Sequence, residues 1–200
     1  SPPPTGLPVA SPSCPGNNTT GSVAHDPAGL ELKLRVPTNA KSFSFNFNFY
    51  TYEWPDYVCS NYNDSFVALQ SPAPPNAKLG NISFDTQGNP VSVNNGFFDA
   101  CGCSGGAPCQ AGGKNFPCSL GTTILQGTGF GIDTTQYDDH GATGWLETKS
   151  PVTPGGEVTL RFAIWDAGDE VLDSTVLIDN FVFSADEATG TTTKPVPTPK

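Results

Sequence analysis

The chain has 200 residues, 36% of them hydrophobic, and 19 acidic against 9 basic side chains give a net charge of −10. This length and hydrophobic content suffice for one buried core. The acidic balance excludes nucleic acid and anionic membranes as expected partners, because both bind a basic face. No apolar run approaches the roughly 18 residues that insert into a bilayer, and no signal peptide begins at Ser1, so we expect a processed, secreted product without membrane insertion.

Both ends of the chain are poor in apolar residues and rich in Pro, Ser and Thr. Segments of this composition are extended and do not bury a core. We therefore expect an N-terminal extension over residues 1–23, one domain over 24–185 and a Thr/Pro-rich tail over 186–200. Such ends can lie against a neighbouring subunit, which makes a homo-oligomer through the extended termini one expectation.

Alternating apolar and polar residues predict half-buried β-strands. The alternation is strictest in three runs: Leu30 to Val36, Phe43 to Phe49, and Val158 to Ile164. The run Val176 to Phe183 is apolar on both faces, which is typical of a central strand. Shorter strands are predicted at Phe66–Gln70, Asn81–Phe84, Val91–Val93 and Trp145–Thr148.

Helical periodicity is almost absent, and turn signals such as Asn95-Gly96 recur between the predicted strands. This pattern predicts an all-β fold, an antiparallel β-sandwich of jelly-roll type. The strand signal thins between about Pro72 and Gly144, where a Gly-rich stretch carries a cluster of cysteines. A loop of this length needs covalent cross-links to be ordered, so we expect a disulfide-stapled insertion.

The six cysteines, together with the absence of methionine, favour an oxidising extracellular compartment. A zinc site is the alternative for the cluster, but Cys-x-x-Cys spacing and a nearby histidine are both missing. Cys101 and Cys103 are too close in sequence to bond each other readily, so each is expected to pair with Cys109 or Cys118. Cys14 and Cys59 then remain as a longer cross-link, one of the 15 pairings that six cysteines allow.

Acidic side chains gather in the segment from Ile164 to Asn180, between two apolar strands. Carboxylates packed so densely resist burial unless a hard cation binds them or water solvates them. We therefore predict a calcium site, in which Asp179 carries most weight because it lies in an otherwise apolar strand. The predicted oxygen ligands are Glu53, Asn63, Asp64, Asp166, Asp169, Asp173, Asp179 and Asn180. The competing interpretation is that several of them cap turns or face water.

Four motifs occur in order along the chain: Tyr52-Glu-Trp-Pro-Asp-Tyr-Val-Cys-Ser-Asn-Tyr-Asn-Asp-Ser-Phe66, Asn94-Asn-Gly-Phe-Phe98, Gly141-Ala-Thr-Gly-Trp-Leu146 and the run from Trp165 to Phe181. With them the chain resembles the choice-of-anchor L domain of secreted bacterial surface proteins, over about residues 24–184. The resemblance implies a secreted β-sandwich joined to a variable cell-surface anchor. The Pro/Thr tail departs from this arrangement, because it carries no recognisable anchor.

Catalytic patterns are weak. Gly102-Cys-Ser-Gly-Gly106 matches the Gly-x-Ser-x-Gly nucleophile motif, but that motif needs a strand leading into a helix. His140 beside two aspartates has the composition of a general base, although a solvated loop histidine is the simpler interpretation. Glu53 with Asp64 or Glu147 has the composition of a glycosidase pair, whose separation sequence does not give. We expect a protein that is not an enzyme.

Aromatic residues suggest carbohydrate binding, because tryptophan and tyrosine rings stack on sugars. Trp54 and Tyr57 follow a predicted strand in a turn and are the expected exposed pair, whereas Trp165 lies within a strand and is expected in the core. The leading interpretation is a calcium-stabilised, non-catalytic surface module acting in adhesion or as a structural subunit of a filament or assembly. Its partners would be neighbouring subunits or a cell-surface carbohydrate polymer. A carbohydrate-binding module is the alternative.

Overall fold

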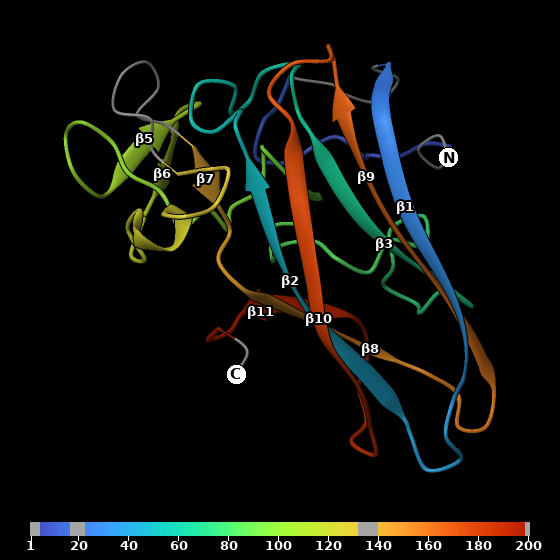
Figure 1. The fold of residues 1–200 in the computed structure, drawn as a ribbon. Coiled ribbons are helices and arrows are strands. Elements are labelled where there is room, and N and C mark those ends of the chain that lie inside the picture. The colour runs from blue at the N-terminus through green and yellow to red at the C-terminus, as the bar shows by residue number, and fades with distance from the viewer. Residues whose placement is uncertain (1–4, 17–22, 132–139, 199–200) are drawn as a thin grey trace.

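The structure is a computed structural model that describes residues 5–16, 23–131 and 140–198 (Figure 1). Two antiparallel sheets form a β-sandwich, as the sequence predicts. The first sheet has the order β1-β9-β3-β4, with β1 at Ala24–Arg35, β9 at Glu157–Ala167, β3 at Ser65–Ser71 and β4 at Val91–Ser92. No helix in these ranges is long and apolar enough to cross a membrane.

The second sheet has the order β10-β2-β8-β11, with a short strand, β7, also paired to β2. The strands are β10 at Ser174–Ser184, β2 at Ser42–Thr51, β8 at Leu146–Pro151, β11 at Thr192–Pro195 and β7 at Gly141–Ala142. From β1 to β2, β2 to β3, β8 to β9 and β9 to β10 the chain passes from one sheet to the other. Such repeated crossing is the connectivity of a jelly roll.

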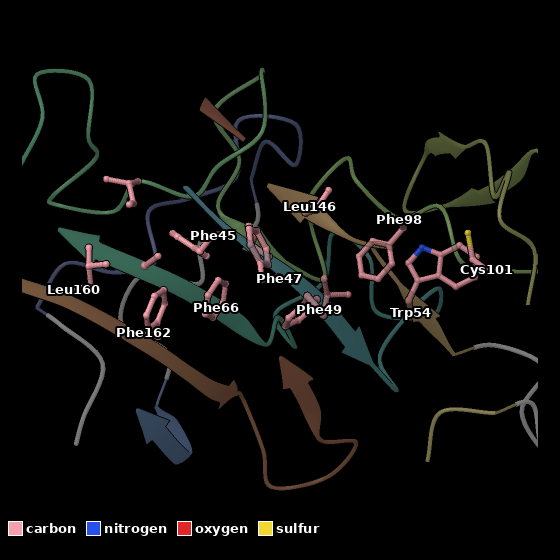
Figure 2. Packing of buried hydrophobic residues seen from close by; sticks show 14 of the residues in the cluster. Phe45, Phe47, Phe49, Trp54, Phe66, Phe98, Cys101, Leu146, Leu160 and Phe162 are labelled. Carbon is pink, nitrogen blue, oxygen red and sulfur yellow. The ribbon is translucent and has the colours of Figure 1, made fainter. Parts of the chain in front are cut away.

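A row of phenylalanines on β2 builds the core between the sheets. Phe43, Phe45, Phe47 and Phe49 are fully buried, two residues apart, so they share one face of the strand. The ring of Phe45 meets the edge of Phe162 on β9 at a centroid distance of 5.0 Å. Figure 2 shows the row continuing beyond the sandwich to Trp54 and Phe98.

The insertion between β4 and β7 covers the end of β2 (Figure 1). It contains a hairpin of β5 (Cys109–Ala111) and β6 (Lys114–Phe116) and a short 3-10 helix, η1 (Thr123–Leu125). The hairpin turn approaches the chain so closely that a Cβ on Gly112 would lie 2.4 Å from the carbonyl oxygen of Val58. A glycine is therefore required at this position, where φ is also positive.

Three disulfides hold the insertion and the N-terminal segment, and the expected pairing is confirmed. The bonds join Cys101 to Cys118, Cys103 to Cys109 and Cys14 to Cys59. Because no described cysteine is free, a zinc-thiolate site is not formed by these residues. The cross-links order a region that has little regular structure of its own.

Both predicted tails belong partly to the sandwich. On the N-terminal side, Leu7 is buried in a cluster that includes Val67 and Trp165 on the outer face of the first sheet. On the C-terminal side, β11 pairs with β8, and the hydroxyl groups of Thr148 and Thr193 lie 2.9 Å apart. The described parts of the termini are therefore held by this chain's own domain, and contact between the termini and a neighbouring subunit stays a prediction.

The prediction that Val176 to Phe183 forms a central strand is wrong. It forms most of β10, which is the edge strand of the second sheet, and Leu177, Ile178 and Val182 are exposed. The register slips between Asp179 and Val182, and this bulge disturbs the alternation of side chains. An edge strand with a bulge thus has the same apolar pattern as a buried one. The predicted strand at Asn81–Phe84 is reduced to isolated bridges.

Substitutions on β2 and β10 test whether β2 carries the core and β10 lies at the edge of the second sheet. Replacing Phe45 by Ala removes a fully buried ring, and we expect unfolding free energy to fall by about 3–5 kcal/mol. Replacing Leu177 by Ala on the edge strand is the control and should change it by no more than about 0.5 kcal/mol. Urea unfolding measures both, and equal losses would contradict the assignment of β10 as an edge.

Candidate functional site

Three acidic side chains meet at the end of the sandwich where β2 and β9 end and β3 begins. Figure 1 shows the arrowheads of β2 and β9 at its upper end. Glu53 follows β2, Asp64 precedes β3, and Asp166 lies near the end of β9. The antiparallel register that pairs Ser65 with Trp165 continues to place Asp64 opposite Asp166. Sheet pairing therefore brings together two acids that are far apart in sequence.

The cluster is compact and buried. One carboxylate oxygen from each of Glu53, Asp64 and Asp166 lies within 4.8 Å of the others. The side chains are exposed by only 1%, 0% and 5%. Three like charges at this separation and burial repel one another strongly, so protons or a cation must compensate them.

Asp64 is held in place by a full set of hydrogen bonds. Its backbone N–H donates to Glu53 Oε2 at 3.0 Å. Its carboxylate accepts a hydrogen bond from the backbone N–H of Ala167 at 3.2 Å and another from the hydroxyl of Ser174 at 2.5 Å. Ala167 belongs to the first sheet and Ser174 to the second, so Asp64 links the two sheets at this end.

Asp166 differs from the other two acids, because neither of its carboxylate oxygens accepts a hydrogen bond from an N–H group or a hydroxyl group, and the carboxyl of Asp64 is the side chain that interacts with it. A buried polar group without a partner costs about 1–3 kcal/mol, and more when it is charged. Nearly all buried polar atoms in proteins are satisfied by protein, water or an ion. One of the Asp166 oxygens lies within 4.8 Å of the other two carboxylates, where either a proton or a cation can satisfy it.

Burial dominates the acid–base behaviour of the cluster. Desolvation raises the pKa of Glu53 to about 8, against the opposing effect of the N–H of Asp64. Desolvation and the neighbouring Glu53 raise the pKa of Asp64 to about 9. The pKa of Asp166 is raised too, first by burial. Without a cation, the cluster therefore holds protons at neutral pH.

The other predicted ligands are divided between the rim of the cluster and more distant positions. Asp169 is half-buried, Asp173 is exposed, and both raise the pKa of Asp166 through their charge, so they lie near the rim. Asn63 is buried, but its side-chain oxygen already accepts a hydrogen bond from the N–H of Asn94 at 3.1 Å. None of the three joins the compact cluster.

Asp179 and Asn180 lie apart from the acidic cluster, contrary to the prediction that Asp179 carries most weight in the calcium site. Both residues are exposed on the edge strand; Asp179 lies opposite Asn46, and Asn180 lies in the bulge. Asp179 lies five residues beyond Ser174, which is about 16 Å along a strand. Its carboxylate accepts a hydrogen bond from the backbone N–H of Asn180 at the bulge, and this contact explains an acid in an apolar run.

The aromatic pair expected on the surface is not formed. Trp54 is fully buried, and its ring packs against Phe98 at 6.0 Å and the edge of Phe116 at 5.8 Å. The insertion folds over the turn after β2 and covers the ring. Tyr57 is half-buried beside Tyr62, which is exposed, whereas Trp165 is in the core as predicted.

The weak catalytic patterns are placed apart from one another. Ser104 lies in an exposed turn closed by the Cys103–Cys109 disulfide. His140 is buried against the ring of Tyr52, and the aspartates beside it, residues 138 and 139, are outside the described residues. Glu147 forms a salt bridge with Lys194 at 3.4 Å and is not in the acidic cluster.

Sequence reasoning found all three acids of the cluster but missed Ser174, the hydroxyl donor to Asp64. Its position at the end of the acidic loop is the only sequence signal for this role. Sequence reasoning also gave the three acids no priority over the five other candidates, because their convergence depends on strand register.

The acidic cluster predicts how the metal-free protein responds to pH. The pKa values of Glu53 and Asp64 are raised far above the values near 4 of an unfolded chain, so the folded state binds more protons between about pH 4 and 9. By linkage, stability falls as pH rises through this window. Thermal unfolding of protein stripped of metal should therefore give a lower Tm at pH 8 than at pH 5.

The control is the double variant Glu53→Gln, Asp64→Asn, which keeps the shapes and removes both ionisable groups. Its Tm should depend much less on pH over the same range. A metal-free wild-type protein whose Tm rises steadily from pH 5 to 8 would show that these carboxyls do not hold protons.

Comparison with known proteins gives one match. The family model of the choice-of-anchor L domain matches residues 17–184, which includes the sandwich, the insertion and all three acids of the cluster. No curated protein and no solved structure matches the chain.

Proposed function

Because the chain belongs to the choice-of-anchor L domain family, a family of surface-associated modules, we propose that it is a non-catalytic extracellular module stabilised by bound calcium. The module serves adhesion or forms a structural unit of a surface assembly. Three disulfides support an extracellular setting, because such bonds persist in oxidising compartments.

The observation that carries the calcium proposal is the pair of orphaned oxygens on Asp166. The carboxylates of Glu53 and Asp64 lie within 4.8 Å of Asp166, so an added hydrogen-bond acceptor would not satisfy these oxygens. His25 on β1 acts on Asp166 in the opposite sense, but its ring is engaged by Glu170 at 2.9 Å. A hard divalent cation satisfies all three groups at once. Calcium takes six to eight oxygen ligands in flexible geometry, and carboxylates bind it in monodentate or bidentate form.

Two further acids at the rim of the cluster also favour a cation. Asp169 and Asp173 add negative charge close to Asp166 from the loop between β9 and β10. This field attracts a cation to the entrance of the cluster. Water supplies the remaining ligands, as is common in calcium sites.

A non-catalytic role fits the burial of the acids. A glycosidase pair must reach its substrate, and the carboxylates of Glu53 and Asp64 are 1% and 0% exposed. Asp64 is also engaged by Ala167 and Ser174, which hold it in a fixed structural position. The arrangement suits the joining of two sheets better than chemistry on a bound molecule.

Calcium should stabilise the protein and chelation should destabilise it. A cation bound only to the folded state adds about 2.7 kcal/mol at a hundredfold excess over Kd. Tm should therefore fall on addition of EDTA at pH 7.5 and recover with excess calcium. An unchanged Tm, with no metal found by elemental analysis, would contradict the proposal.

Two variants test where calcium binds to produce this change in Tm. Asp166→Asn removes one charge from the buried cluster, so it should raise the Tm in EDTA and lose most of the response to calcium. Asp179→Asn, on the exposed edge strand, should match the wild type in both conditions. If Asp179→Asn loses the calcium response while Asp166→Asn keeps it, the site is not the one described here.

The adhesion and assembly roles differ in oligomeric state. Sedimentation of the purified protein in calcium measures that state directly. A monomer that binds cells or their isolated surface polymers would support adhesion, and calcium-dependent filaments or larger particles would support a structural subunit.

A further inference from the structure

A second candidate site is a pocket of about 410 Å³ between the N-terminal segment, the 85–97 segment and β6. The N-terminal segment contributes Ser13, the 85–97 segment contributes Gln87 and Phe97, and β6 contributes Lys114 and Asn115. Pockets of about 300–1,000 Å³ are typical of small-molecule sites. The space admits a group of about the size of one sugar ring.

Lys114 places a positive charge in the wall of this pocket. Its ammonium donates a hydrogen bond to the carbonyl oxygen of Asn94 at 2.5 Å and lies 5.9 Å from the centre of the Phe116 ring. Among the described residues it forms no salt bridge, whereas Lys33, Lys41 and Lys194 each pair with a glutamate. Burial lowers its pKa, which shows that the ammonium is partly desolvated.

Asp85 acts on Lys114 through its negative charge, but the two side chains form no salt bridge among the described residues. Asp85 also lines the pocket, but both of its oxygens are used within its own loop. They accept hydrogen bonds from the backbone N–H groups of Gln87, Asn89 and Gly96, and from the side-chain amide of Asn89. Asp85 therefore shapes the pocket. The ammonium of Lys114 uses one donor on Asn94 and a second on Cys14 Sγ at 3.8 Å, which leaves one donor for an anion.

The remaining lining has the chemistry that binds sugars. Phe97 is half-buried and provides an apolar wall for a ring face. Gln87 and Asn115 are exposed, and their amides offer both donors and acceptors to hydroxyl groups. A cation, an apolar wall and two amides around one space favour a polyhydroxylated ligand that carries one acidic group.

We propose that the pocket formed by Lys114, Phe97, Gln87 and Asn115 binds a carboxylated sugar unit of a surface polysaccharide. The carboxylate pairs with Lys114, and the hydroxyl groups reach the two amides. The net charge of −10 repels a densely charged polymer, so the acid is an isolated unit in an otherwise neutral chain. This inference adds a ligand to the proposed surface module and does not depend on calcium binding.

Binding of methyl glucuronide, methyl glucoside and acetate, followed by NMR chemical shifts with calcium in excess, tests the proposal. We expect methyl glucuronide to bind at least tenfold more tightly than either of the others, with shifts centred on the amides of Gln87 and Asn115. If methyl glucoside binds as tightly as methyl glucuronide, the carboxylate plays no part in recognition. Equal affinity for acetate would show an anion site without sugar recognition. Either result overturns the proposal.

Variants of the lining residues separate binding from folding. Lys114→Met should reduce the affinity for methyl glucuronide at least tenfold, and Lys33→Met, a lysine on β1, should leave it unchanged. Because Lys114 also supports Asn94, its variant is checked by thermal unfolding. Gln87→Ala and Asn115→Ala change exposed side chains and should weaken binding without lowering Tm. If all three variants bind methyl glucuronide as tightly as the wild type, the sugar does not bind in this pocket and the proposal is overturned.

Discussion

Electrostatic repulsion among three buried carboxylates is the constraint that governs one end of this sandwich. Glu53, Asp64 and Asp166 come from segments that must meet if the sheets are to pack with these strand registers. The hydrophobic row on β2 favours that packing, and the acids oppose it. The balance depends on what compensates the charge, so the occupant of the cluster controls how firmly the two sheets are joined.

The rest of the molecule shows how a domain with few helices secures a long insertion. The insertion has little regular structure, yet it covers Trp54 and extends the aromatic core beyond the sheets (Figure 2). Two disulfides fix it internally, and a third ties the N-terminal segment to the turn after β2. Covalent bonds thus replace the secondary structure that orders such regions in other folds.

Sequence patterns predicted the parts of this structure that depend on local alternation. The β2 row follows from alternation alone. Cysteine spacing separated the Cys14–Cys59 bond from the cluster but did not decide between Cys109 and Cys118 as the partner of Cys101. Errors arose where distant segments decide the outcome. Trp54 is covered by residues more than forty positions later, and β10 lies at an edge because β11, the next strand in the chain, pairs with β8 and not with β10. Neither fact leaves a signal in the neighbouring sequence, and the same holds for the convergence of the three acids.

The Cys14–Cys59 bond has a consequence for survival outside the cell. It closes a covalent ring that contains β1 and β2, the strand that carries the core phenylalanines. A protease that cuts one peptide bond inside this ring leaves both fragments attached, and the paired strands keep them in register. The module therefore withstands a single backbone break there without shedding its N-terminal segment, an advantage in surroundings where repair by new synthesis is slow.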